Sequence, residues 1–133
     1  MAPTVIDIEH LEKRFPVETG FLPELLGTQR HVHAVDGVSF SIEEGEIFGL
    51  AGESGCGKTT TGRCLARLEE PSGGTIHFGD GTQNVAELRG DELTAYRRDV
   101  QMVFQDPYSS INDRFRVGRW IREPLEIHDI GDE

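Results

Sequence analysis

The residues with the clearest chemical purpose lie in one glycine-rich run at positions 52–60, which reads Gly-Glu-Ser-Gly-Cys-Gly-Lys-Thr-Thr. The run matches the pattern Gly-x-x-x-x-Gly-Lys-[Ser/Thr], in which glycines let the backbone turn tightly and several N–H groups point at one anion. The spacing therefore predicts a loop that wraps the phosphates of a nucleotide. The residues expected to line this loop are Gly52, Ser54, Gly55, Cys56, Gly57, Lys58, Thr59 and Thr60.

Three side chains of this loop offer different chemistry. Lys58 supplies a point charge for the terminal phosphates and is the expected catalytic cation. Thr59 supplies a hydroxyl oxygen, which Mg²⁺ accepts as a ligand together with phosphate oxygens. Thr60 can reach an inner phosphate, and a helix beginning near Lys58 would add its positive dipole end to the same site. The loop alone decides neither the nucleotide nor the reaction.

A phosphate loop of this kind lies between a strand and a helix, and the flanking sequence predicts both. The run Ile47–Ala51 is continuously apolar, as in a buried strand, and a helix is expected from Lys58 to about Leu68, with Leu65 and Leu68 as its apolar positions. Alternation, turn residues and helical periodicity predict the other elements. These are strands at 4–8, 31–42 (bulged at 36–37), 75–78 and 100–104, helices at 91–98 (capped by Asp91) and 117–127 (broken by Pro124), a turn at 43–46 and a loop at 16–30.

The chain is strongly acidic, with 24 Asp and Glu against 13 Lys and Arg and a formal net charge of −11. This balance disfavours nucleic-acid binding, which needs clustered basic residues. No apolar run approaches the roughly 18 residues of a membrane span, and the first residues lack the basic and apolar segments of a signal peptide. A cytoplasmic protein is therefore expected, in which Cys56 and Cys64 stay reduced.

Asp106 leaves one enzymatic alternative open. Enzymes with a phosphate loop normally hold the metal with a second group, an Asp at the end of an apolar strand. Asp106 follows the apolar run 100–104 closely, so the chain could be a small, self-contained P-loop NTPase or kinase. Against this alternative, Gln105 separates the carboxylate from the strand and Pro107 follows at once.

Several segments resemble the ATP-binding subunits of ABC transporters, in particular the oligopeptide and dipeptide importer branch. Gln105-Asp106-Pro107 resembles the Q-loop of that family. The other matching segments are 34–40, 44–46, 52–59, Leu68 with 71–74, 101–107 and 123–125, so that the resemblance extends from about Val5 to Leu125. It implies an α/β P-loop NTPase fold of the ABC type, with an antiparallel β segment. Residues 1–133 would form the N-terminal portion of that nucleotide-binding domain, with an ATP-binding core at 1–104 and the Q-loop and start of a helical subdomain at 105–133.

The resemblance also implies ligands and partners. ATP and Mg²⁺ would bind at the phosphate loop, Gln105 would contact Mg²⁺ and the attacking water, and Phe15 would stack on the adenine ring, worth on the order of 1 kcal/mol. The subunit would work with transmembrane permease subunits and a second, identical or different, ATP-binding subunit. It would lie peripherally on the cytoplasmic face of the cell membrane and energise import, which in this branch would be the import of peptides.

Three family features do not follow Gln105 in this sequence: a Leu-Ser-Gly-Gly-Gln signature, an apolar strand ending in Asp-Glu, and a switch histidine. The run Asn112-Asp113-Arg114 also stands where the branch commonly has Asn-Pro-Arg. In the family, these features supply the general base and the contact with the second ATP-binding domain. We therefore expect the chain alone to bind ATP without hydrolysing it. A non-catalytic, truncated nucleotide-binding protein is the remaining alternative.

Overall fold

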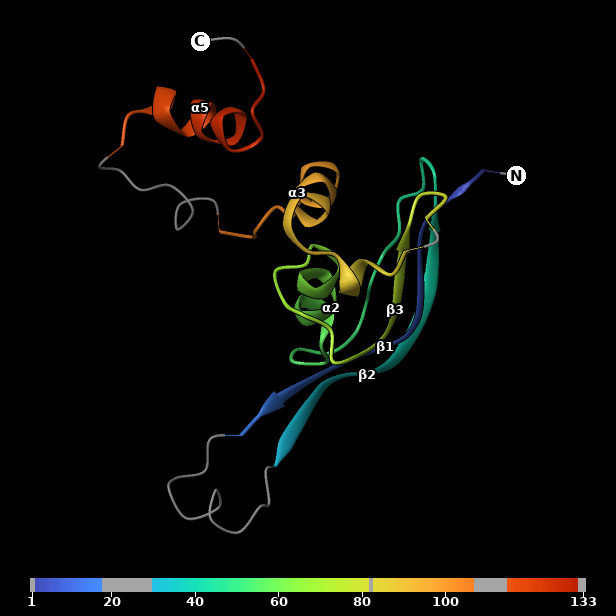
Figure 1. The fold of residues 1–133 in the computed structure, drawn as a ribbon. Helices are drawn as coiled ribbons and strands as arrows, with labels where there is room; N and C mark the ends of the chain where they lie inside the picture. Colours follow the sequence, from blue (N-terminus) through green and yellow to red (C-terminus); the bar gives the residue numbers. More distant parts are fainter. Residues whose placement is uncertain (1, 18–29, 82, 107–114, 132–133) are drawn as a thin grey trace.

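A curved, three-stranded antiparallel sheet organises the fold (Figure 1). The computed structural model describes residues 2–17, 30–81, 83–106 and 115–131. The strands, in the order β2-β1-β3, are β1 (Thr4–Pro16), β2 (His31–Glu43) and β3 (Gly73–Phe78). The helices are α2 (Lys58–Leu65), α3 (Gly90–Asp99) and α5 (Val117–Ile127), with a short 3-10 turn, η1, at Val85–Glu87. Most of the expected loop 16–30, and residues 107–114, lie outside the described residues.

The register of β1 and β2 confirms the expected bulge, and a hydrogen bond of 3.1 Å from the Glu46 N–H to the Glu43 carbonyl confirms the turn that follows β2. Leu11 pairs with Val38 and Lys13 pairs with Val35, so β2 carries an extra residue at positions 36–37. Gly37 there has a φ of +67°, which a residue without Cβ adopts easily. The strand expected at 4–8 is longer than predicted and reaches Pro16, because pairing with β2 outweighs the charged composition of residues 12–14.

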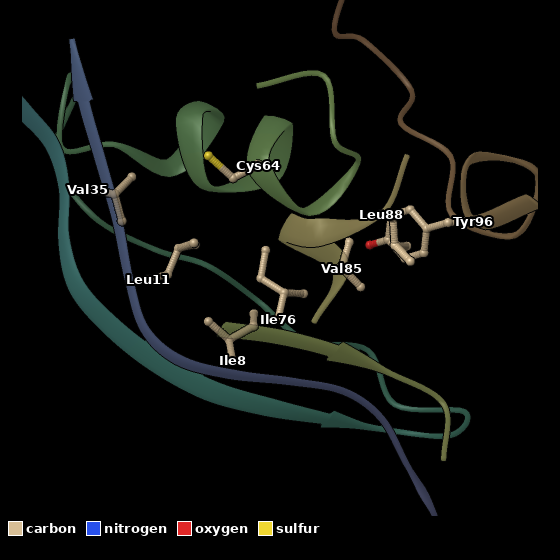
Figure 2. Packing of buried hydrophobic residues seen from close by; sticks show 8 residues of the cluster. All are labelled: Ile8, Leu11, Val35, Cys64, Ile76, Val85, Leu88 and Tyr96. Carbon is tan, nitrogen blue, oxygen red and sulfur yellow. The ribbon is translucent and has the colours of Figure 1, made fainter. Parts of the chain in front are cut away.

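The core lies between one face of the sheet and the helices (Figure 2). Ile8 pairs with Ile76 across β1 and β3, and both side chains are fully buried. Cys64 of α2 and Tyr96 of α3 cover them from the helical layer. The complete buried cluster consists of Ile8, Leu11, Val35, Cys64, Ile76, Val85, Leu88 and Tyr96. This packing joins the helix that follows the phosphate loop to the sheet.

The helix after the phosphate loop is shorter than predicted and buries a different side chain. It ends at Leu65 because Arg67 has a φ of +52°, which reverses the chain after the last turn. Leu68, expected on the apolar face, is therefore outside the helix and 50% exposed, whereas Cys64 is fully buried. Helical periodicity predicted Leu68 on the apolar face, but the helix ends before this residue, so its side chain does not join the core.

Two apolar segments expected as buried strands, 47–51 and 100–104, are not strands in the described part of the chain. Ile47 is 98% exposed and Val103 is 94% exposed. A strand needs the N–H and C=O groups of a neighbour, and the described sheet contains β1, β2 and β3 alone. Phe48 is held locally, because its ring stacks on Phe40 of β2 at 4.7 Å between centroids.

Two predictions about the later helices were wrong: the N-cap of α3 and the break of α5 at Pro124. The N-cap of α3 is Arg89, and Asp91 lies in the first turn, where its charge faces the positive end of the helix dipole. Helix α5 continues through Pro124 from Val117 to Ile127 and buries none of its side chains. Within the described ranges, no helix has the length and apolar character needed to cross a membrane.

Tyr96 makes the fold sensitive to alkaline pH. Its hydroxyl donates a hydrogen bond to the Leu65 carbonyl at 2.5 Å, and burial raises the pKa of Tyr96 to about 12. An unfolded tyrosine titrates near 10, so the stability that this group contributes is complete below pH 10 and is lost as the pH rises towards 12. The free energy of unfolding should fall between pH 9 and pH 11 in the wild-type protein. In Tyr96→Phe we expect this fall to be smaller by about 1 kcal/mol.

Urea denaturation of both proteins at pH 9 and pH 11 measures this difference. Burial also raises the pKa of the Cys64 thiol, so the two proteins share the part of the decline that comes from that group. Equal declines in the wild-type protein and the Tyr96→Phe variant would contradict the assignment to Tyr96.

Candidate nucleotide-binding site

The phosphate loop ends at Gly57, which is the N-cap of α2. Gly57 has a φ of +95°, and a Cβ built there would lie 2.1 Å from the Ala34 carbonyl oxygen of β2. A side chain is therefore excluded at this position both by the backbone conformation and by the close approach of β2. The same contact presses the end of the loop onto the edge of the sheet and fixes where the helix starts.

The start of α2 presents backbone N–H groups and no carboxylate. The N–H of Thr61 donates to the Gly57 carbonyl at 2.8 Å, whereas the N–H groups of residues 58–60 precede the first intrahelical acceptor. No side chain caps the helix, and its first turn contains no acidic residue. The positive end of the helix dipole is thus available to an anion.

Lys58 brings its charge back into the loop. Its ammonium donates to the carbonyl oxygens of Gly52 at 2.8 Å and Glu53 at 2.6 Å, and lies 3.4 Å from the Cys56 thiol sulfur. A Cβ on Gly52 would approach that sulfur to 2.6 Å, so the absence of a side chain at Gly52 keeps the turn tight. The cation and the helix N–H groups therefore belong to one small region of the chain.

The three threonines at the start of α2 have different surroundings. The Thr61 hydroxyl donates to the Gly57 carbonyl at 3.0 Å and the residue is buried, which gives it a structural role that the sequence did not reveal. Thr59 is exposed and Thr60 is half-buried. Among the residues that the structure describes, no group of three or more His, Cys, Asp or Glu could hold a metal ion.

Gln105 lies on the segment that passes beside α2. The Met102 methyl group is 3.7 Å from a Cβ built on Gly62, which places this segment along the helix. Gln105 and Thr59 are both exposed, and within the described ranges no hydrogen bond joins them. The structure thus brings the segment of Met102 near α2, but it does not bring Gln105 and Thr59 together as a pair of metal ligands. Asp106 is also exposed, and it has interactions of its own.

Phe15 lies near the end of β1 and is half-buried. It pairs with Val32, two residues along β2 from Ala34, whose carbonyl abuts Gly57. Phe15 is therefore on the same part of the sheet as the phosphate loop. The Lys13 ammonium lies 4.7 Å from the centre of the Phe15 ring, and it also pairs with the Glu69 carboxylate at 3.1 Å. Lys13 thereby contacts both the Phe15 ring and the turn after α2.

A glycine-rich loop, a lysine held inside it and an uncapped helix N-terminus define a P-loop nucleotide-binding protein. The comparison with protein families narrows this class. Residues 35–125 match the family model described as ABC transporter, and the chain therefore belongs to the ABC transporter family. The resemblance seen in the sequence is confirmed, and the alternative of a self-contained NTPase or kinase built on Asp106 is not favoured.

The chain is similar to ATP-binding proteins named for glutathione import and for oligopeptide transport. It is 46% identical over 129 residues to the glutathione import ATP-binding protein GsiA of Pectobacterium atrosepticum, which covers 97% of this chain and 20% of the relative. It is 53% identical over 104 residues to the putative oligopeptide transport ATP-binding protein YkfD of Bacillus subtilis, covering 78% of this chain and 31% of the relative. The chain thus spans between a fifth and a third of these relatives.

A solved structure supports the fold assignment. The ATP-binding cassette MJ0796, described as a dimer in a post-hydrolysis state bound to ADP and Pi, aligns with a TM-score of 0.54 and 26% identity. The alignment covers 70% of this chain and 35% of the MJ0796 chain. The expected fold, the N-terminal portion of an ABC-type nucleotide-binding domain with an antiparallel β segment, is confirmed.

Proposed function

We propose that this chain forms the phosphate-binding part of the ATP-binding subunit of an ABC importer. The observation that carries the proposal is the position of Lys58, whose ammonium is held inside the loop that leads into the uncapped start of α2. A triphosphate needs several donors and positive charge in one place, and this loop supplies both. The backbone of residues 52–57 would wrap the phosphates, and the Thr60 hydroxyl would reach an inner one.

Magnesium fits the oxygen donors that this site offers. Thr59 keeps an exposed hydroxyl at the start of α2, in contrast to Thr61, whose hydroxyl is already bound to Gly57. Thr59 would hold the metal together with the phosphates, and the Gln105 side chain would complete the site and orient the attacking water. Bound Mg²⁺ would neutralise charge on the phosphate oxygens. Phe15 would contact the adenine ring with the face that Lys13 leaves open.

The names of the relatives suggest the cargo and partners of the complete subunit. GsiA is described as acting in glutathione import and YkfD as acting in oligopeptide transport, so we propose a peptide as the cargo. The subunit would attach to transmembrane permease subunits on the cytoplasmic face of the membrane. A second ATP-binding subunit, as in the dimer of MJ0796, would complete the hydrolytic site. No role in nucleic-acid binding is proposed for this acidic chain.

We expect the purified 133-residue chain to bind ATP and to release no phosphate beyond background. The reason is that the described residues include the proposed phosphate loop and Gln105, but none of them is proposed as the general base that would activate the attacking water. Calorimetric titration with ATP and Mg²⁺ measures binding, and a phosphate-release assay measures turnover. Lys58→Ala serves as the background in the second assay. Turnover that depends on Lys58 and reaches the rate of a working transporter would overturn the expected inactivity, whereas absent binding would overturn the proposed function.

A further inference from the structure

Arg67 occupies a backbone position that normally favours glycine. The chain leaves α2 by a Schellman turn, in which the Arg67 N–H donates to the Cys64 carbonyl at 3.1 Å and the Leu68 N–H donates to the Arg63 carbonyl at 2.9 Å. The residue in the left-handed conformation of this turn is Arg67, with a φ of +52°. Helices most often place glycine there, because a Cβ makes the conformation costly. An arginine at this position is therefore unexpected on conformational grounds, and its side chain calls for a separate explanation.

The Nε of the Arg67 guanidinium is buried and has no hydrogen-bond acceptor. The residue is only 5% exposed, and its Nε is shielded from solvent without a hydrogen-bond acceptor. Across residues 2–17, 30–81, 83–106 and 115–131, no carboxylate forms an ion pair with it. Buried charges in proteins are almost always paired, because desolvation without a partner is costly. The Arg67 Nε–H therefore lacks a hydrogen-bond acceptor among the described residues.

The groups around Arg67 add positive charge and are already engaged. Arg97 donates to the Arg67 carbonyl at 2.6 Å, and Arg89 donates to the Glu70 carboxylate at 2.6 Å. Arg89 also donates to the carbonyl oxygens of Ala86 and Leu88. Burial lowers the pKa of Arg67, Glu70 opposes this shift, and Arg89 and Arg97 add to it. Arg67 thus has two further arginines nearby, and the neighbouring Glu70 carboxylate is already bound by Arg89.

We propose that Arg67 is a binding site for a carboxylate that reaches it from outside the described chain. The Nε–H and the neighbouring terminal N–H of a guanidinium lie side by side and match the two oxygens of a carboxylate. A second negative charge would also balance the local excess of arginine. Arg97, by binding the Arg67 carbonyl, positions the backbone of the site. The source is either an Asp or Glu side chain of another polypeptide segment or a free carboxylate ion.

Nitrogen-15 NMR of the arginine Nε–H signals tests the site in the 133-residue chain. The signal of Arg67 is identified by its loss in Arg67→Gly. It is then followed during titration with sodium acetate and, separately, with N-acetylglutamate N-methylamide, while chloride keeps the ionic strength constant. We expect a saturable shift of this signal. Tighter binding of the glutamate amide points to a polypeptide side chain, and acetate binding at least as tightly points to a free ion. A shift no larger than that in chloride alone would overturn the proposal.

Thermal melting provides a second, independent measurement. Arg67→Gly removes the guanidinium and suits the left-handed backbone, so its melting temperature in chloride is expected to equal or exceed that of the wild-type chain. The gain in melting temperature on replacing chloride by acetate should disappear in Arg67→Gly. It should persist in the control Arg98→Gln, which removes an exposed arginine paired with Asp99. A melting temperature of Arg67→Gly well below the wild-type value in chloride would assign the guanidinium to the fold itself and refute the site.

Discussion

Replacing Lys58 with alanine is expected to weaken ATP binding about 100-fold, which corresponds to roughly 3 kcal/mol. The ammonium of Lys58 lies in the loop on the carbonyl oxygens of Gly52 and Glu53, where a triphosphate would meet it. Alanine removes this charge together with the hydrogen bonds that the ammonium would donate to bound phosphates. Calorimetric titration of the wild-type and variant chains with ATP in the presence of Mg²⁺ measures the change in the dissociation constant.

Arg63→Ala is the matched control for this experiment. It removes one positive charge from the same helix, but its exposed side chain follows the phosphate loop by a full turn and a half. The control should bind ATP with nearly the wild-type dissociation constant, and circular dichroism should show that both variants remain folded. If Lys58→Ala and Arg63→Ala weaken binding equally, the effect comes from net charge and the assignment of Lys58 to the phosphates is wrong.

Replacing Gly74 with alanine is expected to lower the free energy of unfolding by about 3 kcal/mol, a shift of roughly 10 °C in melting temperature. Gly74 has a φ of +83°, and a Cβ built there would lie 2.3 Å from the carbonyl oxygen of His10 and 2.6 Å from that of Glu9. These are backbone atoms of β1, so they cannot move aside without breaking the pairing of β1 with β3. Thermal melting followed by circular dichroism measures the loss.

Gly79→Ala separates the conformational cost from the steric clash. Gly79 also has a positive φ, +66°, but a Cβ there would meet no atom within 4 Å. Only the left-handed backbone cost of about 1 kcal/mol is expected for this variant. A loss for Gly74→Ala no larger than that of Gly79→Ala would mean that the two strands separate easily near His10.

Local chemistry let the sequence predict the phosphate loop, the bulge of β2 and the turn at 43–46. Gly57 shows why, since its φ of +95° is a conformation that glycine adopts readily, and the glycine itself signals it in the sequence. Two roles were missed: the Ala34 carbonyl, distant in the sequence, excludes a side chain at Gly57, and the Thr61 hydroxyl closes the first turn of α2 by bonding the carbonyl four residues earlier. Neither contact has a signature in the spacing of residue types.

The errors of sequence prediction concern elements that depend on partners. The apolar run 47–51 has the composition of a buried strand, yet Ile47 is almost completely exposed, because a strand is defined by its neighbour and not by its own residues. Helix α2 ends before Leu68 because Arg67 adopts a conformation that periodicity does not reveal. The ligand-binding roles of Lys58, Thr59, Thr60, Gln105 and Phe15 remain predictions.

The contact between Gly57 and the Ala34 carbonyl has a thermodynamic consequence. Because the loop rests on β2, a ligand that holds the loop also holds the hairpin, and binding becomes linked to unfolding. At an ATP concentration 100 times the dissociation constant, this linkage adds about 2.7 kcal/mol to the stability of the folded state. Backbone amides of β2 near Ala34 should then exchange their protons with solvent more slowly, so that the sheet itself reports on occupancy of the phosphate loop.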